Sequence, residues 1–349
     1  MLVKYIALLL ALCLSFNFTT VYAAETVTEA SMEPGLVNPG YIEKPEWFKN
    51  SFLDIRDDIN EAAASGRRVM LYFYQDGCPY CAKLIQDNFT QRSIVEKTRK
   101  YFDVIAINMW GDREVTDLAG NTVTEKQFAK SARVMFTPTL LLLTEKAQVA
   151  LRINGYFAPY KLEAALDYVG KKMETQLAFR DYLQKVAAEP ASGKLHQADF
   201  ILKPPYNLQA LSRADKPLLI LFEQKKCSDC DQLHNDIFKR PETRAQLKRF
   251  NVARLDVWAD TPVIDFAGNK TTAKKLAQAL KLKYVPSMLF YDGGREVIRT
   301  EAWLKSFHIQ SVMDYVASGA YQTQPEFQRY ISERADRLEA QGVHVDIWK

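Results

Sequence analysis

Residues 68–85 read RVMLYFYQDGCPYCAKLI, and residues 217–234 read PLLILFEQKKCSDCDQLH. Each stretch opens with a continuous apolar run, which is typical of a strand buried on both faces. A short turn follows, and then two cysteines separated by two residues. Beyond the cysteines, apolar residues recur every three or four positions, a spacing that predicts a helix. Each stretch therefore predicts a strand that leads into a Cys-x-x-Cys pair at the start of a helix.

The two stretches belong to a longer internal repeat. A shift of 149 residues places Cys78 on Cys227 and Cys81 on Cys230. Shifts of 147 or 148 residues align further pairs, namely Trp110 with Trp258, Gly120 with Gly268, Pro138 with Pro286, Asp167 with Asp314, and Phe179 with Phe327. This period is far longer than the roughly 20 to 50 residues of a solenoid repeat. The sequence therefore predicts two tandem α/β domains.

Length and composition agree with this organisation. The chain has 349 residues, of which 48% are hydrophobic and 25% are charged, and one domain takes about 150 residues. Such a balance excludes a disordered chain, and the low content of Gly and Pro excludes a collagen-like one. The net charge of +4 is small, so we expect no nucleic acid as a partner.

The start of the chain has the pattern of an export signal. Lys4 precedes an apolar stretch over residues 5–14, and a small-residue site follows at residues 21–23, the order typical of a secretory signal peptide. We expect cleavage after Ala23, with Ala24 as the neighbouring option. An uncleaved anchor is the alternative, although the apolar stretch is only about half of the ~20 residues that a membrane span needs. The expected location is the periplasm.

Chain breakers and charge patterns suggest the domain borders. Pro and Gly residues recur between residues 189 and 205 and indicate a joint between the two halves. Residues 325–341 have the pattern of a charged helix with one apolar side, which either packs on its own domain or forms a dimer contact. The expected parts are a signal peptide over 1–23, an N-terminal arm over 24–44, a first domain over 45–188, a linker over 189–214, and a second domain over 215–349 with a C-terminal helix.

The cysteines carry the predicted chemistry. Once Cys13 is removed with the signal, four cysteines remain, as two Cys-x-x-Cys pairs. A domain of this size has enough core without disulfides, and so short a loop adds little stability, so the pairs are interpreted as redox-active. At a helix N-terminus the dipole and free N–H groups lower a cysteine pKa from about 8.5 to roughly 3.5 to 7.5. Cys78 and Cys227 are therefore the predicted nucleophiles, and Cys81 and Cys230 resolve the mixed disulfide.

Metal binding is the principal alternative to redox chemistry. A structural zinc site made from all four cysteines would need the two helix N-termini to face each other. Cys227, Cys230 and His234 could form a partial metal site, but the first half has Ile85 at the position of His234. We therefore expect His234 at the surface. No histidine follows either pair directly, which excludes covalent haem. The expected complement of metals and other cofactors is none.

The order of strand, Cys-x-x-Cys, helix, strand and late proline before a further strand resembles the thioredoxin family over both halves. This resemblance implies that each domain has a central mixed sheet flanked by helices. In that family the proline is cis and faces the cysteine pair, so Pro138 and Pro286 are expected to be cis. The same resemblance implies that Thr137 and Val285 present backbone groups to a bound peptide.

The first pair and three nearby segments add detail to the resemblance. Pro79 suits a first helical turn, and Tyr80 is expected to shield the disulfide or contact the substrate. Residues 110–115, residues 137–139 and residues 155–156 resemble more narrowly the exported SoxW-type thioredoxin-related proteins. That resemblance implies a thiol reductant for periplasmic protein partners, with a membrane electron donor as a further partner.

One position departs from the family pattern. Thioredoxin has a buried acid six residues before the leading cysteine, where this sequence has Tyr72 and Leu221, so no proton acceptor for the resolving cysteine is identified. The predicted function is exchange of disulfides with protein thiols and disulfides through both pairs, more as a reductant than as an oxidant. A metal-binding or peptide-holding module without redox turnover is the alternative. The oligomeric state stays open.

Overall fold

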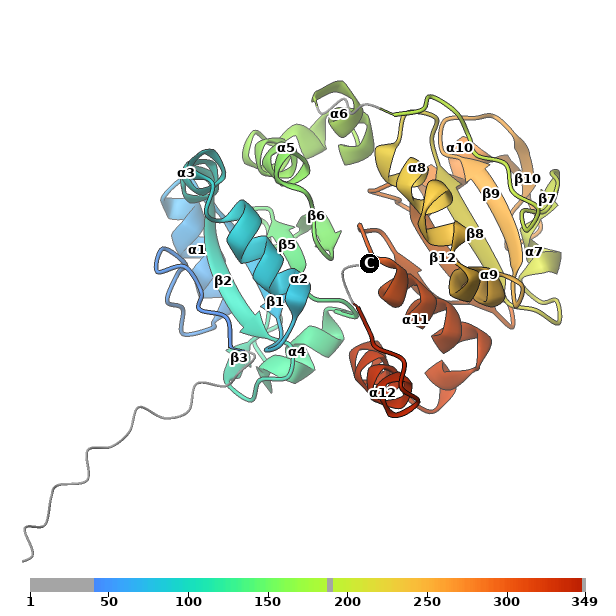
Figure 1. Ribbon diagram of the computed structural model, residues 1–349. Coiled ribbons are helices and arrows are strands. Elements are labelled where there is room, and N and C mark those ends of the chain that lie inside the picture. Colours follow the sequence, from blue (N-terminus) through green and yellow to red (C-terminus); the bar gives the residue numbers. More distant parts are fainter. Residues whose placement is uncertain (1–40, 187–190, 347–349) are drawn as a thin grey trace, which may run out of the picture. The chain divides into compact units, whose positions relative to one another are not determined.

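The computed structural model describes residues 41–186 and 191–346, which all belong to one unit of the chain (Figure 1). The predicted signal peptide and residues 24–40 of the predicted arm lie outside the described residues. None of the helices in the described part of the chain combines the length and the apolar character needed to cross a membrane.

The first repeat forms a mixed four-stranded sheet in the order β2-β1-β5-β6, with β1 parallel to β2 and antiparallel to β5. A short hairpin pairs β3 with β4. The elements are α1 Ile55–Ala64, β1 Arg68–Tyr74, α2 Pro79–Lys83, η1 Leu84–Asn88, α3 Arg92–Tyr101, β2 Phe102–Asn108, β3 Glu114–Thr116, β4 Thr122–Thr124, α4 Glu125–Ser131, β5 Thr139–Leu143, β6 Val149–Asn154, α5 Pro159–Gly170, η2 Met173–Thr175 and α6 Phe179–Val186.

The second repeat forms the same kind of sheet in the order β13-β12-β8-β9, so the predicted duplication of a mixed α/β domain is confirmed. Its elements are β7 Tyr206–Asn207, α7 Leu208–Leu211, β8 Leu218–Glu223, α8 Ser228–Asn235, η3 Ile237–Lys239, α9 Pro241–Leu247, β9 Asn251–Asp256, β10 Pro262–Ile264, β11 Lys270–Thr272, α10 Ala273–Ala279, β12 Ser287–Asp292, β13 Arg295–Thr300, α11 Ser306–Ala317, η4 Ala320–Gln322 and α12 Phe327–Ala340. The predicted C-terminal helix is α12. Elements β7 and α7 fall inside the range expected as linker, and both contribute buried side chains to the second repeat.

The continuous apolar run of β1 serves two cores, one on each face of the sheet. Met70 and Tyr72 face a core shared with α2, α3 and α5, whereas Val69, Leu71 and Phe73 face a core shared with α1 and α4. Side chains alternate along a strand, so a strand covered on both faces needs apolar residues at every position. β8 serves two cores in the same way. Each large apolar side chain that is fully buried stabilises the fold by about 1.5–3 kcal/mol.

The two repeats also exchange aromatic residues. Phe136, which belongs to the first repeat, is part of a core of the second repeat, with its ring 5.3 Å from that of Phe327. Tyr284, the residue equivalent to Phe136, is part of a core of the first repeat, with its ring 5.1 Å from that of Phe157. Both residues directly precede the Thr-Pro or Val-Pro dipeptide of their own repeat. The segments next to the two late prolines therefore join the repeats.

Candidate active site

Both leading cysteines occupy the N-cap of a helix, as the sequence predicts. The Sγ atom of Cys78 accepts a hydrogen bond from the backbone N–H of Cys81 at 3.1 Å, at the start of α2. The Sγ atom of Cys227 accepts one from the N–H of Cys230 at 3.0 Å, at the start of α8. Pro79 lies in the first turn of α2, where no donor is needed. An N–H group directed at sulfur, together with the helix dipole, stabilises negative charge on that atom.

Each pair forms a disulfide within itself. The Cα atoms of Cys78 and Cys81 are 5.2 Å apart, and those of Cys227 and Cys230 are also 5.2 Å apart. All four cysteines are buried, and the most exposed is Cys227, at 6%. Among the described residues, no group of three or more His, Cys, Asp or Glu side chains is placed to hold a metal ion.

The late prolines lie beside the cysteine pairs. The Thr137–Pro138 and Val285–Pro286 peptide bonds are both cis, which confirms that expectation. The Thr137 hydroxyl donates to the Sγ atom of Cys78 at 3.3 Å, and this sulfur lies 3.4 Å from the Thr137 carbonyl oxygen. In the second repeat Val285 and Cys227 line the same pocket. The structure therefore brings these sequence-predicted residues together, and their role in holding a peptide stays a prediction.

Tyr80 lies between Cys78 and Cys81 and is buried against the second repeat. Its hydroxyl accepts from the backbone N–H of Lys305 at 3.2 Å and lies 3.4 Å from Nδ1 of His308. Its ring packs edge-on against Trp303. Burial raises the pKa of Tyr80 to about 12 and lowers the pKa of His308 to about 4, so both side chains are neutral at pH 7. Contact between Tyr80 and a substrate stays a prediction.

Asp229 lies between Cys227 and Cys230, and it contacts two residues that the sequence analysis did not single out. Its carboxylate forms an ion pair with Lys161 of α5, with Nζ and Oδ2 2.6 Å apart. It also accepts a hydrogen bond from the hydroxyl of Tyr284. Each Cys-x-x-Cys motif therefore contacts the other repeat through its intervening residues. The acidic residue inside the second motif was the signal for a basic partner.

The expectation that His234 lies at the surface is wrong. His234 is only 7% exposed, and its Nε2 atom lies 2.6 Å from Oε1 of Glu223 at the end of β8. His234 follows Cys230 by one turn and shares its inward-facing side of α8, where the buried Glu223 carboxylate requires a partner. His196 stacks on His234 and lies 2.6 Å from Asp231. A lone acid at the end of the apolar run in 217–223 was the available signal.

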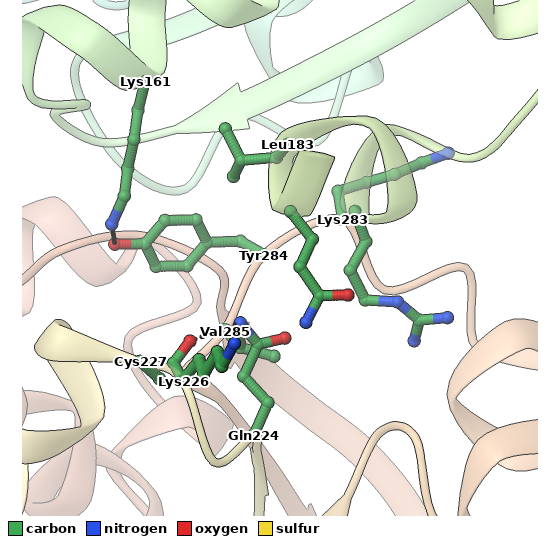
Figure 2. A pocket seen from close by; sticks show the side chains of 10 residues that line it. Lys161, Leu183, Gln224, Lys226, Cys227, Lys283, Tyr284 and Val285 are labelled. Carbon is green, nitrogen blue, oxygen red and sulfur yellow. Dashed lines mark hydrogen bonds between the residues drawn. The ribbon is translucent and has the colours of Figure 1, made fainter. Parts of the chain in front are cut away.

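A pocket of about 380 Å³ lies against Cys227. Figure 2 shows Lys161 and Tyr284 on one side of it, with Cys227, Lys226 and Val285 gathered on another. Cys227, Val285 of the cis-proline segment and several cationic residues therefore line one cavity. A substrate disulfide that reaches Cys227 through this pocket would meet those cations.

Comparison with known proteins places this geometry in a family. The model of the thioredoxin-like domain matches twice, over residues 55–170 and 205–317. A thioredoxin-fold protein from Helicobacter pylori is 20% identical over 37% of this chain and 91% of its own, with a TM-score of 0.32. A thioredoxin from Thermus thermophilus is 24% identical over 33% of this chain and 83% of its own, with a TM-score of 0.27.

A disulphide isomerase from Xylella fastidiosa Temecula1 is 10% identical over 38% of this chain and 95% of its own, with a TM-score of 0.25. The comparison with curated proteins returned no match. The family assignment rests on the two domain matches, which together span well over half of the residues. The chain therefore belongs to the thioredoxin-like domain family and carries that domain twice.

Proposed function

We propose that this protein is a thiol–disulfide oxidoreductase that reduces disulfides of protein partners in the periplasm. The observation that carries the proposal is the position of Cys78 and Cys227. Each is an N-cap whose sulfur receives a backbone N–H, with its resolving partner three residues along the same helix. Two independent repeats that keep this arrangement beside a cis-proline support exchange chemistry over a purely structural role.

The proposed reaction is a pair of thiolate displacements. The leading thiolate attacks one sulfur of the substrate disulfide, forming a mixed disulfide and releasing the other substrate sulfur, which takes a proton. The resolving cysteine then loses its proton and attacks the leading sulfur. The second substrate thiol leaves, and the protein retains the two cysteines as a disulfide. A dithiol donor, proposed to be a membrane protein, returns two electrons and two protons to the pair.

Insulin reduction in the presence of dithiothreitol tests this activity. We expect Cys78→Ser and Cys227→Ser each to lower the rate above background, and the double variant to abolish it. Turnover by the double variant at the wild-type rate would contradict the proposal. Stoichiometric zinc without turnover would instead support the metal-binding alternative. Equilibration with dithiothreitol buffers tests the direction, because a reductant requires potentials nearer to about −270 mV than to about −120 mV.

Export is tested by expressing the full chain in a Gram-negative bacterium and sequencing the N-terminus of the protein from the periplasmic fraction. The expected mature chain begins at Ala24, or at Glu25 if cleavage follows Ala24. A protein that stays in the cytoplasm with residues 1–23 attached would contradict this part of the proposal.

A further inference from the structure

The pocket beside Cys227 has a strongly cationic lining. Its wall includes Lys161, Arg180, Lys226 and Lys283, and the residues that line it include no carboxylate. Lys161 is paired with Asp229 at 2.6 Å and Arg180 lies 3.5 Å from Asp181, so Lys226 and Lys283 add positive charge that these two carboxylates do not balance. The volume of about 380 Å³ falls within the range of about 300–1,000 Å³ typical of small-ligand sites.

Arg180 is the strongest indication that the pocket takes an anion. The side chain is only 6% exposed, and its Nε and Nη1 atoms have no hydrogen-bond partner. The guanidinium lies over the ring of Trp258, 4.3 Å from its centroid. The nearest acid is its own neighbour Asp181, whose Oδ1 atom is 3.5 Å from Nε and is also without a hydrogen bond. A buried guanidinium with unused donors is costly unless an anion pairs with it.

The internal repeat supplies a built-in comparison for the charged positions. Arg180 aligns with Gln328, and Lys283 with Met135, at an offset of 148. At the first site Gln328 is satisfied, since it donates to the Met135 carbonyl oxygen at 3.0 Å and accepts from Gln75 at 3.1 Å. Lys226 aligns with Gly77, at the offset of 149 that also aligns the cysteines. The second site is therefore cationic at three positions where the first is neutral.

The scaffold around these positions is otherwise shared. Trp258 donates from Nε1 to Gln224 at 2.8 Å, and the equivalent Trp110 donates to Gln75 at 2.7 Å. The first site also has a guanidinium over its tryptophan, that of Arg329 at 4.9 Å from the Trp110 ring centroid, but Arg329 is 60% exposed and paired with Glu326 at 2.6 Å. The second site therefore differs in holding a buried guanidinium whose Nε and Nη1 atoms have no hydrogen-bond partner. Burial also lowers the pKa of Lys283, an effect that a bound anion would oppose.

We propose that this pocket binds a carboxylate of the substrate, so that the second cysteine pair prefers disulfides flanked by acidic groups while the first pair does not. This inference rests on the proposed exchange function and names its substrate class. Arg180 is placed to donate a charge-assisted hydrogen bond to the carboxylate. The carboxylate belongs either to an acidic segment of a protein or to a small disulfide such as oxidised glutathione.

The test uses the full chain with Cys78→Ser and Cys81→Ser, in which only the second pair is active. Three disulfide-linked peptides carry Glu, Gln or Lys residues next to the cysteine, and kcat/KM is measured for each. One charge-assisted pair predicts roughly tenfold faster reduction of the Glu peptide than of the Gln peptide. Cys227→Ser with Cys230→Ser leaves the first pair, for which we expect no acidic preference.

Substitutions copied from the first site identify the residues responsible. Arg180→Gln and Lys283→Met should bring the Glu-to-Gln ratio to about one. Lys185→Gln is the matched control. Lys185 is exposed, lies on α6 and does not line the pocket, so this substitution removes one positive charge from the same helix without changing the pocket. Its ratio should stay that of the parent. Equal rates for all three peptides, or a ratio unchanged by Arg180→Gln, would overturn the inference.

Oxidised glutathione distinguishes the two sources of carboxylate. Reduction of glutathione disulfide that depends on Arg180 identifies a small disulfide as a substrate, whereas reduction of the Glu peptide alone identifies a protein segment. If no substrate is reduced, the proposed function fails at this pair, and calorimetry with cysteine-free Glu and Gln peptides tests the pocket separately. Tighter binding of the Glu peptide that is lost in Arg180→Gln supports the inference, and equal binding overturns it.

Discussion

The two cysteine sites have the same backbone arrangement but differ in whether a charged residue is buried beside them. Glu223 and Tyr74 occupy equivalent positions at the ends of the two central strands, and His234 and Ile85 occupy equivalent positions on the helices that follow. The Glu223 carboxylate is 1% exposed and has His234 as its partner. A buried carboxylate without a partner is costly, so the pair must be present together or absent together.

Substitution of His234 by isoleucine, the residue at the equivalent position, leaves Glu223 buried and unpaired. We expect His234→Ile to lower the free energy of unfolding by about 3 kcal/mol. Glu223→Leu with His234→Ile should recover most of this loss, because neither variant residue is charged. Chemical denaturation followed by tryptophan fluorescence measures both. A double variant as unstable as His234→Ile would contradict this account.

His308 predicts a loss of stability in mild acid. Burial lowers its pKa to about 4, whereas an unfolded histidine titrates near about 6.5. Between these values the unfolded chain binds a proton that the folded chain does not, so stability falls as the pH drops from 6.5 towards 4. The contribution at pH 5 is at most about 2 kcal/mol.

The check is the pH dependence of unfolding in the wild type and in His308→Gln. The glutamine keeps a polar group next to the Tyr80 hydroxyl but does not titrate. We expect the wild type to lose more stability than the variant between pH 7 and pH 5. Parallel curves would show that His308 does not titrate in this window.

At the scale of elements, equivalent helices begin with equivalent caps. Thr124 caps α4 by accepting from the N–H of Gln127, and the Gln127 side chain accepts from the N–H of Thr124. Thr272 caps α10 by accepting from the N–H of Lys275. Of these two helices, only α4 therefore has a reciprocal capping box. These caps fix the helices that pack beneath the sheets, on the faces away from the cysteine pairs.

Removal of either cap should destabilise the protein by about 1 kcal/mol, because one N–H group at the helix start loses its acceptor. Thr124→Ala and Thr272→Ala are compared by chemical denaturation, with Thr→Ser at each position as the control that keeps the hydroxyl. We expect no more than a small loss for the serine variants. Alanine variants as stable as the wild type would show that water satisfies these donors equally well.

Across the whole described molecule, each repeat completes a core of the other. Phe136 contributes to a core of the second repeat, and Tyr284 contributes to a core of the first. A backbone bridge between Tyr156 and Trp303 adds a further contact between the repeats. Because these residues adjoin the cysteine pairs or the cis-prolines, the contacts that join the repeats also fix the surroundings of both sites.

We expect Phe136→Ala to lower the free energy of unfolding by about 3–5 kcal/mol, because it removes a large buried ring. The loss should appear in the unfolding of both repeats, although the residue belongs to the first. Hydrogen exchange resolved along the chain measures this distribution. Phe52→Ala is the control, since Phe52 is fully exposed and should change stability by less than about 0.5 kcal/mol. Protection lost only in the first repeat would contradict the coupling.

The cis-prolines were expected from the resemblance to the thioredoxin family. Local patterns in the sequence were sufficient for the repeat, the α/β domains and the N-cap position of the leading cysteines. Each depends on residues close together in the chain, or on a comparison of one half with the other. The surface position expected for His234 failed because its partner Glu223 lies eleven residues away on a different element. A pattern within one helix does not reveal what that helix packs against.

The sequence by itself determined that this protein holds two cysteine pairs, each at the junction of a buried strand and a helix, because hydrophobic periodicity and cap chemistry act over a few residues. Only the tertiary structure decided that Arg180 of the first repeat lies in the pocket of Cys227, and that Tyr80 is buried against residues near 305. These neighbours are separated by tens to hundreds of residues, and their contacts are set by how whole packed surfaces fit together. The charge of the second site is therefore a property of the folded pair of repeats.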